Sequence, residues 1–139
     1  MKFIYLGMWL RQYHLSFIAR LIDYFIIRGF YSCDVQSNTK IGKDLDLSHN
    51  GLGVVIHPRS VIGDNVKILQ GVTIGGRFGP QLPIIGNNVQ IGAGAKILGG
   101  VRIGNNARIG ANAVVLIDIP DGCTAVGVPA KIISSKNNE

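Results

Sequence analysis

The sequence predicts an all-β fold, a parallel β-helix of hexapeptide repeats, with a short helical segment at the N-terminus. The main observation is a period of six, which is neither the 3.6 of a helix nor the alternation of a single strand. It is typical of short strands joined by turns, where three strands close one coil and stacked coils bury one aliphatic column. The column is clearest at Ile85, Ile91, Ile97, Ile103, Ile109 and Val115.

The same period extends over residues 34–133, which we predict to be one β-helix domain. Two insertions interrupt it, at residues 48–53 and 75–83. Insertions in repeat proteins leave the stack as loops, often on the binding face, so we expect functional residues there. The earlier repeats place aliphatic residues at Val35, Ile41 and Leu47, and then at Ile56, Ile62, Ile68 and Ile74.

Residues 1–33 are predicted to form the helical segment, with one helix over residues 3–28 and a stop at Gly29. Its apolar stripe consists of Leu15, Ile18, Leu21, Ile22, Phe25 and Ile26. Charged residues interrupt every apolar run well short of the ~20 residues that a membrane span needs. Two fates stay open. The helix packs on the β domain or on a neighbouring subunit, or it lies on a membrane with Trp9, Tyr13 and Tyr24 at headgroup level.

Composition limits the partners and the compartment. The net charge of +6 permits nucleic acid, anionic lipid or a phosphorylated ligand, and solubility explains it equally well. We expect no nucleic-acid partner. Two cysteines without a C-x-x-C motif and no signal-peptide cleavage pattern predict a cytoplasmic protein, peripheral at the inner face of the membrane if the helix binds lipid. No His or Cys cluster has metal-ligand spacing, so no metal is expected, and residues 134–139 are predicted to be a flexible tail.

His49, in the first insertion, is the best candidate for a general base, because imidazole titrates near neutral pH. A solvated loop histidine explains it equally well from the sequence. His14 is most simply a surface residue, and His57 is expected to point outward. Asp34 lies fifteen residues before His49, almost one circuit of the coil, so the two residues can meet. A carboxylate partner would fix the imidazole tautomer.

Three motifs resemble the serine acetyltransferase branch of the hexapeptide-repeat acyltransferases: GVTIGG at 71–76, IGAGAKILG at 91–99 and GVPAKI at 127–132. The resemblance implies a left-handed β-helix, an exception to right-handed crossovers. It also implies acetyl-CoA as the donor and a homotrimer with active sites between subunits. In this family His49 matches the catalytic histidine and Asp34 its carboxylate partner.

The resemblance also implies where acetyl-CoA binds. The pantetheine arm would run in a groove between coils of adjacent subunits, and a backbone N–H near Gly76 would stabilise the oxyanion. Lys96, Arg108 and Lys131 would bind the CoA phosphates, although a solvated basic face explains these three residues almost as well. The predicted cofactor-binding residues are Gly76, Arg77, Ala93, Gly94, Lys96, Arg108, Ala111 and Lys131.

Three residues depart from the serine-specific pattern. Members that use serine carry Asp before the catalytic histidine, where this chain has Ser48, and Arg-His before the proline of the second insertion, where it has Gln81 and Leu82. They also carry a larger helical N-terminal domain. The chain therefore resembles the short acetyltransferases of surface-polysaccharide biosynthesis, and we expect an O-acetyltransferase that acts on a sugar hydroxyl. The alternatives are a serine O-acetyltransferase of cysteine biosynthesis and a non-catalytic β-helix scaffold.

Overall fold

A computed structural model describes residues 2–135, and the side chains of residues 2–133. The helices are α1 (Lys2–Gln12), α2 (Ser16–Leu21), the π-helix η1 (Ile22–Phe30) and the 3-10 helix η2 (Ser48–Gly51). The strands are β1 (Asp34–Val35), β2 (Lys40–Ile41), β3 (Asp46–Leu47), β4 (Val55–Ile56), β5 (Val61–Ile62), β6 (Lys67–Ile68), β7 (Thr73–Gly75), β8 (Ile84–Ile85), β9 (Gln90–Ile91), β10 (Lys96–Leu98), β11 (Arg102–Ile103), β12 (Arg108–Ile109), β13 (Val114–Val115), β14 (Cys123–Val126) and β15 (Lys131–Ser135).

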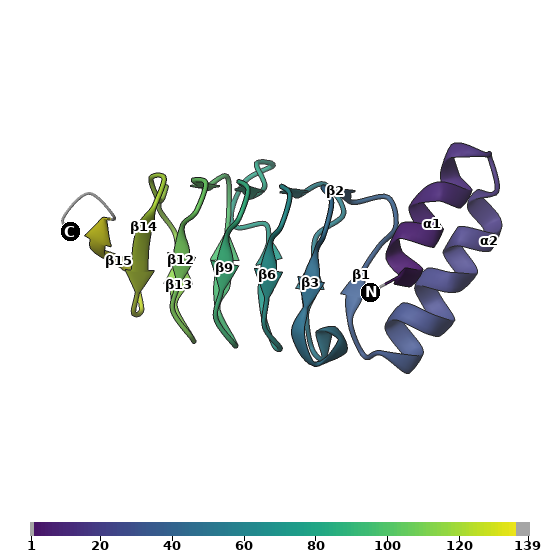
Figure 1. Ribbon diagram of the computed structural model, residues 1–139, viewed down its shortest axis with the longest axis horizontal. Coiled ribbons are helices and arrows are strands. Elements are labelled where there is room, and N and C mark those ends of the chain that lie inside the picture. The colour runs from purple at the N-terminus through teal and green to yellow at the C-terminus, as the bar shows by residue number, and fades with distance from the viewer. Residues whose placement is uncertain (1, 136–139) are drawn as a thin grey trace.

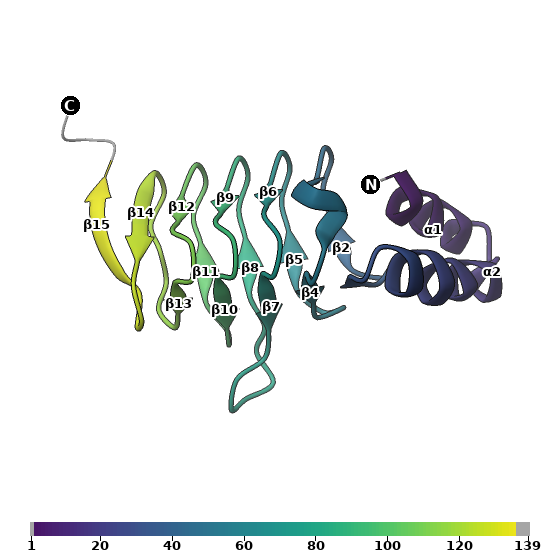
Figure 2. The same cartoon turned by 90° about the horizontal axis from the view of Figure 1, so that it is seen from below.

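The strands form the three walls of the predicted left-handed parallel β-helix. Sheet A has the order β1-β4-β7-β10-β13, sheet B β2-β5-β8-β11, and sheet C β3-β6-β9-β12-β14-β15. From β1 to β12, consecutive strands therefore pass from sheet A to B to C, and each set of three closes one coil. Figures 1 and 2 show the coils stacked along one axis, with the helices at the N-terminal end. Only β15 runs antiparallel among the paired strands described, and it ends at Ser135; residues 136–139 of the predicted tail lie outside the described residues.

The strand register confirms the period of six. In sheet A, Ile97 pairs with Ile74 on one side and Val115 on the other, and all three side chains are buried. Equivalent columns run through sheets B and C. Burying one such side chain contributes roughly 1.5–3 kcal/mol. The fully buried residues that form these columns include Ile56, Ile62, Ile68, Ile74, Ile85, Ile91, Ile97 and Ile103.

Polar side chains order the corner between sheets B and C. The Asp64 side chain accepts the Lys43 N–H at 2.7 Å, and Asn87 accepts the Asp64 N–H at 2.8 Å. Asn105 and Asp121 continue the ladder, each accepting the N–H of the residue one coil before it at 2.8 Å. These bonds satisfy backbone donors that the strands leave unpaired, so each coil is tied to the next.

The two insertions leave the stack at different corners. Helix η2 lies between β3 and β4, at the corner between sheets C and A. Residues 76–83 lie between β7 and β8, at the corner between sheets A and B, and project from the prism in Figure 2. Within one chain, the two predicted functional loops thus border opposite edges of sheet A.

The prediction of one helix over residues 3–28 is wrong. The chain reverses after α1, where His14 takes the left-handed φ of 61°, and α2 with η1 returns along α1 (Figure 1). A single helix of that length would extend about 39 Å. The reversal instead brings Ile4 of α1 and Ile27 of η1 together into the core that continues into the β-helix. Among the described residues, no helix has the length and apolar character to cross a membrane.

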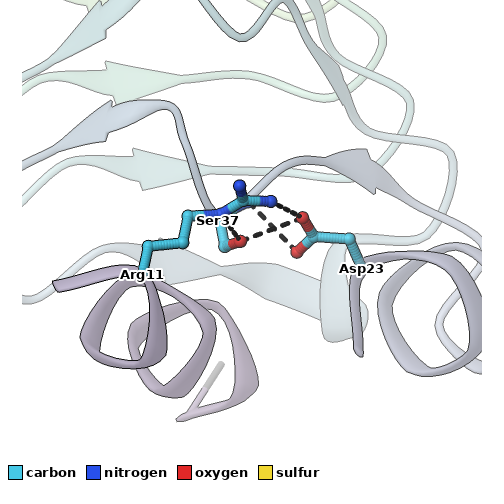
Figure 3. Close-up of polar contacts among 3 residues, drawn as sticks. All are labelled: Arg11, Asp23 and Ser37. Atoms are coloured by element: carbon cyan, nitrogen blue, oxygen red, sulfur yellow. Dashed lines mark hydrogen bonds and ion pairs between the residues drawn. The ribbon is translucent and has the colours of Figure 1, made fainter. Parts of the chain in front are cut away.

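A partly buried polar network docks this helical hairpin on the first coil (Figure 3). Arg11 of α1 donates to Asp23 of η1 at 2.9 Å and to the Ser37 hydroxyl at 2.7 Å. Asp23 also accepts the Ser37 N–H at 3.1 Å and its hydroxyl at 2.9 Å. A Cβ on Gly7 would lie 2.6 Å from the Ser37 Cβ, so only glycine permits this approach. The network fixes both arms of the hairpin relative to β1.

Candidate active site

His49 lies on a rigid turn with its side chain exposed. Its backbone takes the left-handed conformation, with φ 54° and ψ 36°. The Leu52 N–H donates to the His49 carbonyl at 3.2 Å, and the Gly53 N–H donates to the Ser32 carbonyl at 2.9 Å. The second bond ties the insertion to the segment just before β1. The imidazole is therefore presented from a fixed backbone, which a general base requires.

Asp34 begins β1, and its N–H donates to the Val54 carbonyl at 2.8 Å, so it lies beside the end of the His49 insertion. Its carboxylate accepts from Arg28 Nη2 at 3.1 Å, in an ion pair whose side chains are 33% and 62% exposed, respectively. Within residues 2–133, no hydrogen bond joins Asp34 to His49. The structure thus brings the two residues to neighbouring segments, while Arg28 holds the carboxylate.

The corner that carries His49 also carries three of the predicted CoA-binding residues. Ala93 and Gly94 lie between β9 and β10, and Ala111 lies between β12 and β13, at the same corner between sheets C and A. Gly71 and Gly94 take φ of 70° and stack on one another, where a Cβ on Gly71 would lie 3.7 Å from the Gly94 Cα, an ordinary van der Waals distance. We call this line of stacked turns, from Gly71 to Ala111, the corner rail. Backbone hydrogen bonds join its turns, since the Gly94 N–H donates to the Gln70 carbonyl at 2.9 Å and the Asn112 N–H donates to the Ala93 carbonyl at 2.8 Å.

The three predicted phosphate-binding residues differ in their surroundings. The Lys96 ammonium donates to the Gly71 carbonyl at 2.7 Å and is partly buried, so this side chain supports the corner rail. Arg108 and Lys131 are exposed on sheet C, on strands that both pair with β14. Two cations therefore lie on the wall that adjoins the corner rail.

Gly76 and Arg77 lie at the other corner, in the second insertion. The Arg77 guanidinium carbon lies 5.6 Å from the Phe78 ring centroid, a cation–π arrangement. The loop folds over Gly100, where a Cβ would lie 2.5 Å from the Gln81 Cβ. A groove of about 540 Å³ follows this loop along Leu98 and Ile117. In a single chain these residues do not meet His49, so a site that uses both loops needs a second copy of the chain.

Sequence reasoning missed the residues around Asp34 on the helical side. A hollow of about 330 Å³ is lined by Arg20, Tyr24 and Arg28 of the hairpin together with Asp34. Arginines in an amphipathic helix do not by themselves indicate a charged hollow. They reach the first coil because η1 leads directly into β1, and the reversal at His14 adds Arg11 to the lining.

Two further observations limit the chemistry available to the site. Burial raises the pKa of the Cys33 thiol, beside Asp34, from 9.0 to about 11, so the thiol is neutral near pH 7. Within the described part of the chain, no group of three or more His, Cys, Asp or Glu side chains could hold a metal ion. The groups that remain for chemistry are an exposed imidazole, a carboxylate and several guanidinium groups.

The hexapeptide repeats identify the class of protein. Residues 83–116 match the family described as bacterial transferase hexapeptide (six repeats). The serine acetyltransferase of Helicobacter pylori is 46% identical over 121 residues, which cover 85% of this chain and 70% of that protein. The chain therefore belongs to the serine acetyltransferase family.

Two further comparisons agree. The serine acetyltransferase of Synechococcus elongatus is 42% identical over 128 residues, which cover 90% of this chain and 52% of that protein. A crystal structure of serine acetyltransferase in complex with coenzyme A, from Brucella abortus, aligns with a TM-score of 0.84 and 36% identity, covering 96% of this chain and 54% of that one. The chain spans about half the length of several curated relatives that it matches.

The comparisons correct the predicted acceptor. The prediction of a sugar hydroxyl depends on Ser48, Gln81 and Leu82, and it is wrong, because the relatives at 42–51% identity and the similar structures are serine acetyltransferases. The polysaccharide-biosynthesis subtype has no support among them. Three substituted positions are a weak guide to the acceptor, since other elements of the fold can supply the missing charges.

Proposed function

We propose that this protein transfers the acetyl group of acetyl-CoA to the hydroxyl of serine. The observation that carries the proposal is His49, held on a rigid left-handed turn at one end of the corner rail. The relatives named as serine acetyltransferases, one of them in complex with coenzyme A, support both substrates.

The proposed reaction is a direct transfer. His49 takes the proton of the serine hydroxyl while the oxygen attacks the thioester carbonyl of acetyl-CoA. The tetrahedral intermediate then collapses and breaks the C–S bond, and the imidazolium returns the proton to the departing thiolate. Asp34 would hold the imidazole in the tautomer that accepts this proton, and the Gly76 N–H would stabilise the oxyanion.

The pantetheine arm would lie along the corner rail, past Ala93, Gly94 and Ala111. A thin chain of this kind can lie against small side chains, and these three residues present such a surface on the stacked turns. Arg108 and Lys131 on the adjoining sheet C would meet the phosphates. Lys96 would act indirectly, because its ammonium is engaged by the Gly71 carbonyl.

The proposed assembly is a homotrimer with active sites between subunits. Its support is the placement of the two insertions at opposite edges of sheet A, since Gly76 and Arg77 of one copy can meet His49 only in another. Light scattering tests it. A mass of three chains agrees with the proposal, and a monomeric active enzyme contradicts it.

A cytoplasmic location and peripheral membrane contact through residues 3–28 also stay proposals. The hairpin exposes apolar side chains that one chain does not cover, including Phe17 at 74% and Phe25 at 64%. Apolar area beside arginines favours an anionic bilayer surface. We expect the protein to co-sediment with anionic vesicles and the double variant Phe17→Ser, Phe25→Ser to lose this binding. If the same surface packs inside the trimer, the wild-type protein should not bind the vesicles.

The experiment that tests the proposed reaction is thiol release from acetyl-CoA against a panel of hydroxyl acceptors. We expect serine to be acetylated with a far higher kcat/KM than threonine, glycerol or simple sugars. A preference for any of these over serine would contradict the proposed acceptor, and no thiol release with any of them would contradict transferase activity.

A further inference from the structure

The hollow beside Asp34 is charged, and its arginines have no role in the proposed reaction as described above. It lies where the helical hairpin meets the first coil and has a volume of about 330 Å³. Its charged lining consists of Arg11, Arg20, Asp23, Arg28 and Asp34. Three guanidinium groups face two carboxylates, so the hollow carries an excess of positive charge.

The ion pairs show which charges are already engaged. Arg11 and Asp23 form the partly buried network with Ser37, at 2.9 Å from guanidinium to carboxylate, and so serve to dock the hairpin. Arg28 contacts Asp34 at 3.1 Å with one nitrogen and is largely exposed. Arg20 makes no hydrogen bond or ion pair with another side chain within residues 2–133. Both side chains are exposed, so the donors that can meet a ligand in the hollow are those of Arg20 and the remaining N–H groups of Arg28.

We propose that Arg20 and Arg28 bind the carboxylate of the amino-acid acceptor. This inference rests on the proposed function, in which the acceptor is serine. A guanidinium group donates two parallel hydrogen bonds to a carboxylate, a geometry that lysine cannot supply. Because Arg28 also contacts Asp34, a carboxylate held there lies beside the residue assigned to orient His49, and the serine hydroxyl is only three bonds away from it.

The position of the hollow explains how a chain with Gln81 and Leu82 can still use serine. The second insertion offers Arg77 as its cation, and that guanidinium group lies on the exposed Phe78 ring. The helical hairpin supplies two guanidinium groups instead, from residues eight positions apart on α2 and η1. In this account the N-terminal helices are part of the acceptor site.

The test compares serine with serine methyl ester, which keeps the hydroxyl and the ammonium but has no carboxylate. For wild-type enzyme we expect a much lower KM for serine than for the ester. Arg20→Gln and Arg28→Gln should each raise the KM for serine about tenfold to hundredfold, the worth of hydrogen bonds to a charged group. The KM values for the ester and for acetyl-CoA should stay unchanged, and Arg20→Lys should recover part of the affinity.

Arg102→Gln is the matched control, because Arg102 is an exposed arginine on β11, in sheet B and away from the hollow. It should leave all three KM values unchanged. Equal effects of the Arg20 and Arg28 variants on serine and on its ester, or no effect on either, would overturn the inference while leaving serine acetylation intact. Failure of wild-type enzyme to acetylate serine would overturn the proposed function itself, and the inference with it.

Discussion

At the scale of single residues, His49 combines an exposed imidazole with a backbone conformation that few residues accept. Asn populates the left-handed region readily, so His49→Asn keeps the turn and removes the base. We expect kcat to fall by ~10²–10⁴, the usual worth of general-base catalysis. Steady-state kinetics with serine and acetyl-CoA measure it.

His57→Asn is the control for this variant. His57 is another histidine of the β-helix, and its Nδ1 accepts the Arg59 N–H at 3.1 Å. The control should keep wild-type turnover, and both variants should keep the circular dichroism of the wild type. Unchanged turnover in His49→Asn would remove this residue from the mechanism.

The Cys33 thiol gives a pH-dependent prediction. Burial raises its pKa to about 11 from 9.0, so the folded protein should resist alkylation by iodoacetamide at pH 8, while the unfolded chain reacts. Well below pH 9 the thiol is mostly protonated in both states. Between pH 9 and about 11 the unfolded thiol ionises first, so this group lowers the stability of the folded state as the pH rises. Rapid labelling of native Cys33, followed by mass spectrometry, would contradict the assignment.

Residue roles divide into those that the sequence predicts and those that only the fold reveals. The aliphatic columns are predictable because each position repeats along the chain. The bond from Lys96 to the Gly71 carbonyl joins two coils through a side chain, and the period of six contains no information about it. The pair of Arg28 and Asp34 depends on where the hairpin packs, which no local pattern determines.

At the scale of elements, strand β10 shows how strongly each coil depends on its inward residue. Ile97 has no exposed surface and packs between Ile74 and Val115. Ile97→Asp would place an unpaired carboxylate in this column, at a cost of several kcal/mol against a total stability of about 5–15 kcal/mol. We expect loss of soluble, cooperatively folded protein.

Gln90→Asp is the matched control for Ile97→Asp. Gln90 is outward and exposed on β9, between Lys67 and Arg108 in the register of sheet C. A new carboxylate there meets two cations, so this variant should fold with a thermal midpoint close to that of the wild type. Cooperative unfolding of soluble Ile97→Asp at the wild-type midpoint would mean that the register is incorrect.

The helical hairpin depends on the network of Arg11, Asp23 and Ser37. Asp23→Ala removes the carboxylate and leaves the partly buried Arg11 without its partner, which should cost about 1–3 kcal/mol. Hydrogen exchange should become faster in α1 and η1 while the β-helix amides stay protected. Unchanged exchange in both helices would show that apolar contacts such as Ile4 and Ile27 dock the hairpin without the network.

The elements themselves were predictable to different degrees. The sequence predicts the β-helix and both insertions because one hexapeptide contains all the information that its strand needs. It does not predict the break after α1, because Tyr13, His14 and Leu15 include neither glycine nor proline. The reversal is favoured by the burial of both arms against the first coil, an interaction between distant parts of the chain.

At the scale of the whole molecule, the site is divided between corners of the prism. His49 and the corner rail border one edge of sheet A, and Arg77 borders the other. In the proposed assembly, the parts of one site therefore come from two copies of the chain, and the helical hairpin beside Asp34 is proposed to bind the acceptor. The acceptor could not be predicted from Ser48, Gln81 and Leu82 alone, because the charges that bind it can come from elements that the fold brings together.

The central claim is transfer of acetyl from acetyl-CoA to serine, and the identity of the product tests it most directly. Wild-type enzyme supplied with serine and acetyl-CoA labelled with ¹³C in the acetyl group should form O-acetylserine, observed by NMR as a new ester carbonyl signal. The rate should fall ~10²–10⁴-fold in His49→Asn. Free labelled acetate without the ester, or an ester formed equally fast by His49→Asn, would contradict the account.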